Sequence, residues 1–220
     1  MRSIVLTLAL LLLPAVATAG EDLDDHLRKS TTAFGELNDR VPDHIRKDAR
    51  CVSVITAGKG GFIFGGTGGR GFLTCRDKGG SAWSAPVVLD IGGGSAGAQI
   101  GGQKLEIVMV FTNIEDIDEV ARTTPVFHGT ASATAGTKGT GVTAGGNPEA
   151  EAGVFTVSQS EGLYAGATGE ALVVNPDEEE TAKLLGGTHD LNEVLVKRSV
   201  PVPDSAKAFV AAVAAWAKGA

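Results

Sequence analysis

Residues 57–102 read AGKGGFIFGGTGGRGFLTCRDKGGSAWSAPVVLDIGGGSAGAQIGG. Short apolar, β-prone segments alternate in this stretch with pairs and triplets of glycine. Such a density of glycine argues against a helical core, because each glycine inside a helix costs roughly 0.5–1 kcal/mol relative to alanine. Glycine does permit tight turns, bulges and close approach of two backbones. The stretch therefore predicts an antiparallel sheet with tight joints between its strands.

Further strands are expected on both sides of this stretch. The pattern predicts strands over residues 51–56, 61–64, 71–76, 82–89, 96–101 and 105–111, and again over 154–160, 163–168 and 171–174. A tight turn is expected at Glu161 and Gly162, between two of the later strands. Residues 129–153 are mostly Ala, Gly, Thr and Ser, and this composition fits either small-residue strands or a long loop.

Helices are expected at both ends of the chain. Over residues 22–38, Leu23, Leu27, Phe34 and Leu37 recur on one helical face. Further helices are predicted over 43–49, over 114–121, from the Asn-Pro-Asp sequence that begins at Asn175, and over 204–218. In the last of these, Phe209, Val213 and Trp216 form an apolar stripe. The fold class is therefore α+β, with an antiparallel glycine-rich sheet or partly closed barrel covered by N- and C-terminal helices.

The N-terminus has the composition of a secretory signal peptide. Arg2 precedes an apolar run over residues 4–13, and Ala17-Thr18-Ala19 forms a cleavage site of the A-x-A type. The apolar run is shorter than the roughly 20 residues that span a bilayer. We therefore expect residues 1–19 to be removed and residues 20–220 to form one exported domain in the periplasm or cell envelope, with no transmembrane segment.

The chain contains two cysteines, Cys51 and Cys75. An even number of cysteines in an exported protein favours a disulfide. The alternative is that both are small buried apolar residues. Neither has the C-x-x-C spacing of a redox motif or a zinc site.

The charge of the chain excludes one class of partner. Its formal net charge is −7, whereas a nucleic-acid-binding protein needs a basic surface. Residues 51–104 are locally basic, with two acidic residues against five basic ones: Lys59, Arg70, Arg76, Lys78 and Lys104. This excess could face an anion, or it could be the charged, solvated edge of a sheet.

No motif for catalysis or cofactor binding is convincing. The run from Gly66 to Gly71 satisfies G-x-G-x-x-G, but a strand is predicted to follow it where a dinucleotide site needs a helix. The four histidines lack metal-ligand spacing, and no G-x-S-x-G sequence is present. We therefore expect a protein that is not an enzyme and that carries no cofactor or metal.

Four aromatic residues fall within the glycine-rich region: Phe62, Phe64, Phe72 and Trp83. Large apolar residues on strands are usually buried, so the simplest expectation places them in the core of the sheet. An alternative is that Trp83 is exposed near basic residues, which suits the boundary of a lipid bilayer.

Several short motifs together resemble the SYLF domain, and the resemblance covers nearly all of residues 20–220. They are Gly60-Gly61-Phe62, Gly65-Gly66, Gly69-Arg70-Gly71, Cys75-Arg76-Asp77, Trp83-Ser84-Ala85-Pro86, Gly92-Gly93-Gly94-Ser95, Gln99-Ile100-Gly101-Gly102-Gln103, Val108-Met109-Val110-Phe111, the run from Ser158 to Gly166, and Asn175-Pro176-Asp177. SYLF domains occur alone in bacterial exported proteins and joined to Src-homology-3 or FYVE modules in eukaryotes.

The resemblance implies a compact domain that binds acidic phospholipids. We expect peripheral binding to an anionic phospholipid membrane surface, with Trp83 as an interfacial anchor and four basic residues as headgroup contacts: Lys59, Arg70, Arg76 and Lys78. Two alternatives remain. One is an envelope protein that binds a protein partner through its sheet edge or acidic face, and the other is a hydrolase whose site forms only in three dimensions.

Overall fold

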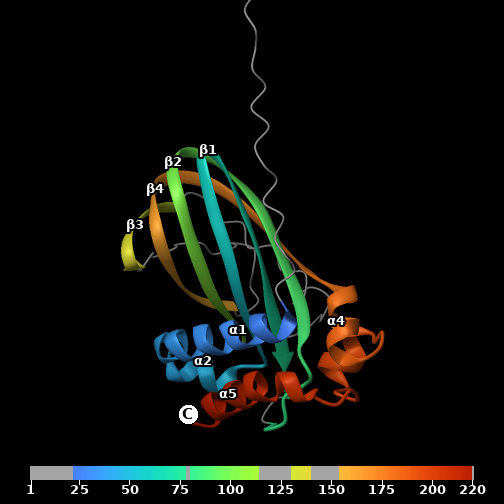
Figure 1. Cartoon of the computed structure of the whole chain (residues 1–220). Helices are drawn as coiled ribbons and strands as arrows, with labels where there is room; N and C mark the ends of the chain where they lie inside the picture. Colours follow the sequence, from blue (N-terminus) through green and yellow to red (C-terminus); the bar gives the residue numbers. More distant parts are fainter. Residues whose placement is uncertain (1–21, 78–79, 114–129, 140–153, 220) are drawn as a thin grey trace, which may run out of the picture.

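The computed structural model describes residues 22–77, 80–113, 130–139 and 154–219. Its elements, in chain order, are α1 (Leu23–Leu37), the 3₁₀ turn η1 (Asn38–Arg40), α2 (Asp43–Asp48), β1 (Cys51–Cys75), β2 (Val87–Phe111), β3 (Thr130–Gly139), β4 (Val154–Pro176), α4 (Glu178–Leu185), the π-helical turn η2 (Asn192–Val196), the 3₁₀ turn η3 (Asp204–Ala206) and α5 (Lys207–Lys218). The α+β class is confirmed. One antiparallel sheet, which is not closed, is covered at one end by the N- and C-terminal helices (Figure 1).

The predicted helical faces are the buried ones. Leu27, Phe34 and Leu37 of α1 are buried, and Asp22 accepts a hydrogen bond from the backbone N–H of Asp24 at the start of the helix. The ring of Phe34 meets that of Trp216 of α5 edge to face, with the centroids 5.5 Å apart. The indole of Trp216 also donates a 3.2 Å hydrogen bond to the carbonyl oxygen of Asn38. The two terminal helices are thereby packed together.

The sheet has the order β1-β2-β4-β3, and all of its pairs are antiparallel. β1 and β4 each pair with β2 along nearly their whole length. The short strands expected from the sequence are therefore segments of a few long ones. β2 and β4 keep one register from the Leu89–Pro176 pair to the Phe111–Val154 pair. The turn predicted at Glu161 and Gly162 is wrong, because both residues pair within this ladder. Gly162 has a φ of 140° there, and a Cβ on it would lie 2.4 Å from the carbonyl oxygen of Gly102.

β1 turns back on itself at Ile63. This residue has a φ of 64°, and the register with β2 shifts between Phe62 and Phe64. Beyond the turn the inner faces of the two halves of β1 nearly touch. A Cβ on Gly69 would lie 2.3 Å from the carbonyl oxygen of Thr56, and one on Gly71 would lie 2.6 Å from Cγ1 of Ile55. Glycine is therefore required for this close approach.

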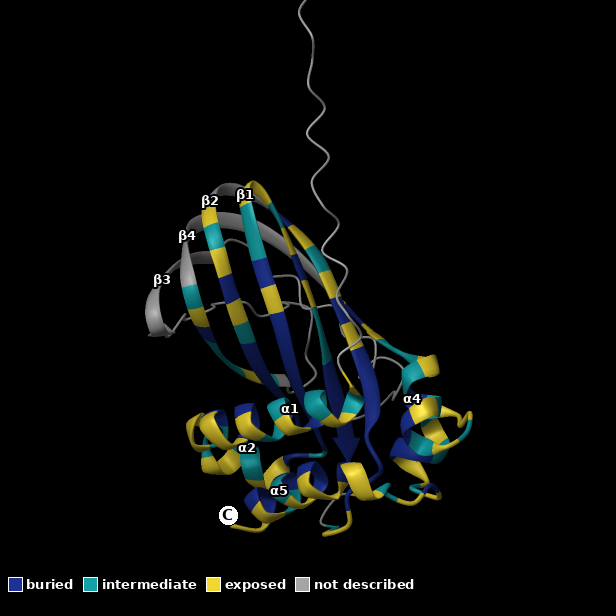
Figure 2. Ribbon diagram, in the orientation of Figure 1, coloured by how far each residue is buried: buried dark blue, intermediate teal, exposed yellow. Residues whose placement is uncertain are grey.

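Two apolar cores lie on opposite faces of the bent sheet. The inner core gathers the odd-numbered apolar residues of β1 and β2, such as Ile55, Leu73, Leu89 and Met109. The outer core joins the even-numbered strand residues to the helices, and Phe72 packs there against Phe209 of α5, with the ring centroids 5.8 Å apart. Both cores lie at the helical end of the sheet, whereas the bend of β1 is largely exposed (Figure 2).

Three expected segments differ from the described structure or lie partly or wholly outside it. Residues 82–86 are not a regular strand, because Trp83 makes only an isolated bridge with Arg76. The helix expected over 114–121 lies outside the described residues. Of residues 129–153, the part that is described forms strand β3 (Thr130–Gly139), and the rest lies outside the described residues.

Candidate functional site

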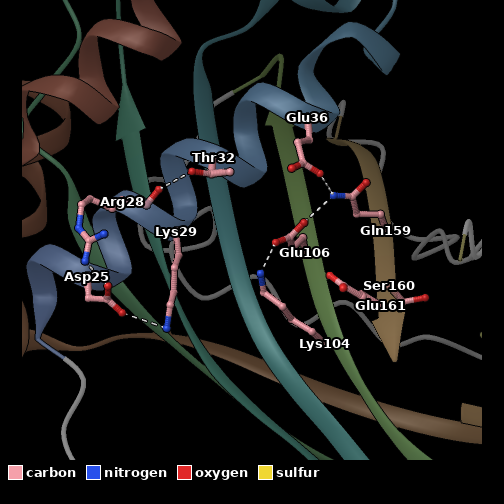
Figure 3. Close-up of a pocket in the computed structure, with 10 residues that line it drawn as sticks. All are labelled: Asp25, Arg28, Lys29, Thr32, Glu36, Lys104, Glu106, Gln159, Ser160 and Glu161. Atoms are coloured by element: carbon pink, nitrogen blue, oxygen red, sulfur yellow. Dashed lines mark hydrogen bonds and ion pairs between the residues drawn. The ribbon is translucent and has the colours of Figure 1, made fainter. Parts of the chain in front are cut away.

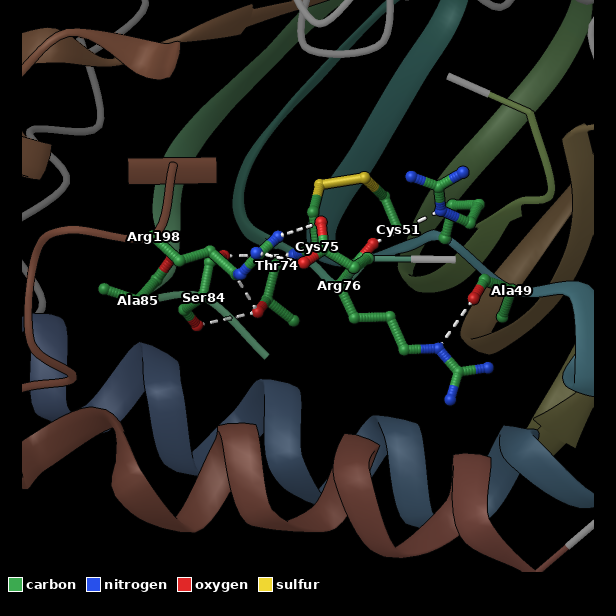
Figure 4. The surroundings of a disulfide bond; sticks show 10 residues. Ala49, Cys51, Thr74, Cys75, Arg76, Ser84, Ala85 and Arg198 are labelled. Carbon is green, nitrogen blue, oxygen red and sulfur yellow. Dashed lines mark hydrogen bonds and ion pairs between the residues drawn. A yellow bond between two sulfur atoms is a disulfide. The ribbon is translucent and has the colours of Figure 1, made fainter. Parts of the chain in front are cut away.

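The predicted disulfide is present between Cys51 and Cys75, at the helical end of the sheet (Figure 4). Both cysteines are buried. The adjacent Ser84 side chain accepts a 3.1 Å hydrogen bond from the backbone N–H of Cys75 and donates one of 2.8 Å to the carbonyl oxygen of Ala85. The surroundings of the disulfide are therefore packed and hydrogen-bonded.

Arg76 lies beside the disulfide with its guanidinium turned into the protein. Its Nε donates to the carbonyl oxygen of Ala49 at 2.8 Å, and one Nη donates to the carbonyl oxygen of Lys47 at 3.1 Å. Both carbonyls belong to the C-terminal end of α2, where the helix leaves backbone acceptors unsatisfied. Burial lowers the pKa of the Arg76 guanidinium, and the nearby charge of Arg50 lowers it further. Arg76 is therefore engaged in holding α2 against β1.

Trp83 packs against Arg76. The guanidinium carbon of Arg76 lies 5.2 Å from the ring centroid of Trp83, which is a cation–π arrangement. Trp83 is only 7% exposed. The expectation that Trp83 lies in the core is confirmed, and its ring is not displayed at the surface as an interfacial anchor would be.

Arg70 faces three carboxylates. Its guanidinium nitrogens lie 3.6 Å from Asp90, 3.7 Å from Asp177 and 3.6 Å from Glu180. Asp177 also accepts a 2.9 Å hydrogen bond from the backbone N–H of Glu180, which starts helix α4. Partial desolvation raises the pKa of the Asp90 carboxyl, as does the charge of Asp177, while Arg70 lowers it. The charge of Arg70 is thus neutralised within the protein.

The four predicted headgroup contacts do not form one exposed basic surface. Lys59 is 5% exposed, and Arg76 is 9% exposed. Arg70 is surrounded by acids, and Lys78 lies outside the described residues. The sequence shows the basic excess of this region, but it does not show which of these side chains find carbonyl or carboxylate partners inside the fold.

A polar cavity of about 280 Å³ lies between α1 and the strands β2 and β4 (Figure 3). Its lining carries three basic residues, Arg28, Lys29 and Lys104, against four acidic ones, Asp25, Glu36, Glu106 and Glu161. The basic side chains are paired: Lys104 lies 2.6 Å from Glu106, Lys29 lies 3.0 Å from Asp25, and Arg28 also contacts Asp25. A hydrogen bond from Lys29, with the positive charges of Lys29 and Arg28, lowers the pKa of Asp25. This cavity does not offer the excess positive charge that an anionic headgroup needs.

Phe62, Ile63 and Phe64 are exposed at the bend of β1. Their exposed fractions are 68%, 51% and 75%. The expectation that Phe62 and Phe64 belong to the core is therefore wrong, although Phe72 is fully buried as expected. Glycine pairs stand on both sides of this Phe-Ile-Phe sequence, so adjacent residues provide no side chains for the rings to pack on. That flanking pattern is the sequence signal that could have identified these residues.

The same end of the sheet contains long uncharged segments. Residues 60–69, 91–103 and 162–169 contain no Asp, Glu, Lys, Arg or His. These segments pair with one another, as in the Gly60–Gly102 and Gln103–Gly162 pairs. At the opposite end, helices α1, α2 and α4 are rich in charge. The described fold is therefore polarised, with charged helices at one end and an uncharged, partly apolar sheet at the other.

The described residues provide neither a metal site nor a membrane-spanning helix. No group of three or more His, Cys, Asp and Glu side chains is positioned there to hold a metal ion. Among the helices that the structure describes, none combines the length and the apolar character needed to cross a bilayer.

The chain is similar in sequence to a known protein family and to several known proteins. Residues 92–216 match the family model described as "Ysc84: Las17-binding protein actin regulator", which is the SYLF domain. LAS seventeen-binding protein 3 of Saccharomyces cerevisiae is 30% identical over 178 residues, which is 80% of this chain and 38% of the yeast protein. Protein YSC84 of the same yeast is 30% identical over 181 residues, or 81% of this chain and 38% of the relative.

A human relative also matches. SH3 domain-containing YSC84-like protein 1 of Homo sapiens is 26% identical over 129 residues, which is 58% of this chain and 37% of the human protein. The chain thus spans about two fifths of the length of these curated relatives. No solved structure matches.

Proposed function

Because the chain belongs to the SYLF family, we propose that it is a non-enzymatic protein that binds peripherally to phospholipid surfaces. The observation that carries the proposal is the uncharged end of the sheet, where large apolar side chains are exposed. Exposed apolar clusters on a soluble domain mark sites that contact proteins or membranes. A lipid surface can accept this end without leaving any charged group buried.

The structure changes the expected mode of contact. Of the basic side chains expected to hold headgroups, Lys59 and Arg76 are buried and Arg70 is paired with acids, and the whole chain has a net charge of −7. Attraction to anionic headgroups is therefore a weak source of affinity. We propose that apolar contact provides most of the binding, so that anionic lipid and low salt are not required.

We also propose that the protein acts after export, in the periplasm or envelope. The disulfide between Cys51 and Cys75 supports this placement, because disulfides persist mainly in oxidising compartments. The signal-like composition of residues 1–19 is the second support.

Flotation with vesicles tests the proposed function. The protein is purified after export, its lack of residues 1–19 is verified by mass spectrometry, and it is mixed with zwitterionic or anionic vesicles at low and high salt. We expect flotation with both kinds of vesicle and little effect of salt. Absence of flotation with every composition would refute lipid binding.

A protein partner is the second candidate function. The family description names Las17 binding and actin regulation, and one of the yeast relatives is named LAS seventeen-binding protein 3. These descriptions apply to the family and the relative, and they favour a protein contact of this domain as well. Capture of a defined partner by a chain that fails to float with vesicles would select this candidate.

A further inference from the structure

We infer that Phe62, Ile63 and Phe64 form an apolar wedge that, with Ile100, inserts into the interfacial region of a lipid bilayer. The inference rests on the proposed function and names the part of the molecule that enters the lipid. None of these residues belongs to the basic set expected from the sequence.

The four side chains are all exposed at the bend of β1, three of them consecutive in the chain and the fourth on the paired strand. Ile100 is 60% exposed and is the β2 partner of Phe62 in the sheet register. Residues paired across an antiparallel ladder have neighbouring side chains. The wedge therefore presents two aromatic rings and two branched aliphatic chains at a single point of the sheet.

The backbone of the wedge is strained. Ile63 has a φ of 64°, a conformation that is disfavoured for a β-branched residue. Gly60, Gly61, Gly65 and Gly66 surround the wedge, and glycine at position 63 would adopt the same conformation without this cost. The Ile63 side chain is 51% exposed, and backbone strain of this kind clusters at functional sites.

The surroundings of the wedge suit the edge of a bilayer. Charged groups are costly in hydrocarbon, and the three paired segments at residues 60–69, 91–103 and 162–169 contain none. Within the described chain the helices lie at the opposite end of the sheet (Figure 1). Shallow insertion of the wedge therefore leaves the charged helices in water.

The size of the wedge favours lipid over a folded partner. A stable protein interface buries about 800 Å² on each side and uses about 20–30 residues. Four large side chains on a narrow bend provide much less than that, but shallow insertion into a bilayer needs only a small apolar element. We therefore assign the wedge to lipid, and a second copy of the chain becomes an outcome that the test can detect.

The first test removes the apolar surface. Phe62→Ser/Phe64→Ser is compared with the wild type and with Val196→Ser, which removes an apolar side chain that is 44% exposed in η2. We expect the double variant to lose at least about tenfold in partition to zwitterionic vesicles, given the apolar area removed. Val196→Ser should bind like the wild type.

The second test separates binding from folding. Ile63→Gly removes apolar surface and also relieves the backbone at position 63. We expect weaker vesicle binding together with an equal or higher midpoint of thermal unfolding. A variant that merely damages the fold would show weaker vesicle binding and also a lower midpoint of thermal unfolding.

The third test reports depth. The native tryptophans, Trp83 and Trp216, are both buried, so Phe64→Trp adds an exposed indole at the wedge. We expect lipids brominated in the acyl chain to quench this variant and to leave wild-type fluorescence unchanged. Absence of quenching in vesicle-bound Phe64→Trp would overturn the inference.

The outcomes separate the inference from the proposed function. If the wild type does not bind vesicles, both fail. If the wild type binds and the double variant binds equally, only the wedge is refuted. If the double variant changes the sedimentation coefficient and leaves vesicle binding unchanged, the wedge joins copies of the chain instead.

Discussion

Cys51 and Cys75 are the first and last residues of β1, and the disulfide between them joins the two ends of a strand that turns back at Ile63. The cysteines are 24 positions apart in the sequence. A crosslink that closes a loop of this length stabilises the folded state by about 3 kcal/mol, because it restricts the unfolded chain. We expect Cys51→Ala/Cys75→Ala to lower the free energy of unfolding by that amount in guanidinium titrations.

Reduction provides the control for the cysteine variant. A thiol reductant should destabilise the wild type and leave the double variant unchanged. Equal midpoints for the oxidised wild type and the double variant would contradict a stabilising role for the bond.

Arg76→Lys tests whether Arg76 is structural or binds headgroups. Lysine keeps the positive charge, but its single ammonium cannot reproduce the guanidinium contacts with the carbonyls of Ala49 and Lys47. We expect a loss of about 2 kcal/mol in the free energy of unfolding, the range for buried hydrogen bonds to charged groups. Vesicle binding at temperatures well below the unfolding midpoint should be unchanged, and a selective loss of binding would restore Arg76 as a lipid contact.

Gly71→Ala tests the close approach inside β1. The added Cβ would lie 2.6 Å from Cγ1 of Ile55 and 2.7 Å from the carbonyl oxygen of Val54. Overpacking of this kind costs about 1–3 kcal/mol. Gly58→Ala is the matched control, since a Cβ there meets nothing within 4 Å. Equal unfolding midpoints for the two variants would show that the halves of β1 are further apart than described.

Asp90→Asn tests the acidic cluster around Arg70. Partial desolvation and the charge of Asp177 raise the pKa of Asp90 above its usual 3.8 in the folded protein. The folded state thus favours the protonated carboxyl, so this group's contribution to stability is greatest below pH 3.8 and is lost as the pH rises through the folded-state pKa. We expect Asp90→Asn to have a higher unfolding midpoint than the wild type at neutral pH. The difference between the two midpoints should be smaller at acidic pH.

The exposed Asp39 provides the control for that variant. Asp39→Asn should leave the pH dependence of the midpoint as in the wild type. If Asp90→Asn is instead less stable than the wild type at neutral pH, the contact between Asp90 and Arg70 outweighs the partial desolvation of Asp90 and its repulsion from Asp177.

Local signals in the sequence predicted the helices well. The apolar spacing of Leu27, Phe34 and Leu37 marks the buried face of α1, and Phe209, Val213 and Trp216 mark that of α5. The start of α4 was predicted as well, although Asp177 rather than Asn175 is its cap. These features depend on neighbouring residues, which a single sequence displays directly.

The length of the strands was less accessible from the sequence. Glycine pairs such as Gly65-Gly66 look like turns, yet they lie within β1 and pair with β2. Glycine occurs both where the chain reverses direction and where two backbones approach closely. Only the position of the partner backbone, which is distant in sequence, distinguishes the two uses.

The site was the least predictable part. Lys59, Arg70 and Arg76 look alike in sequence, but their exposure depends on carbonyls and carboxylates contributed by other elements. Phe62 and Phe72 are both aromatic residues in predicted strands, yet one is 68% exposed and the other is fully buried. α5 supplies the ring of Phe209 that covers Phe72.

The disulfide also determines what happens when the backbone of β1 is cut. Phe62 and Phe64 are exposed and lie between the two cysteines, so a protease that cleaves after aromatic residues can reach the bend. Both pieces of such a nicked chain stay covalently linked through Cys51 and Cys75. The nicked protein would migrate as one band on a gel without reductant and as two bands with it, so cleavage at the bend becomes visible only after reduction.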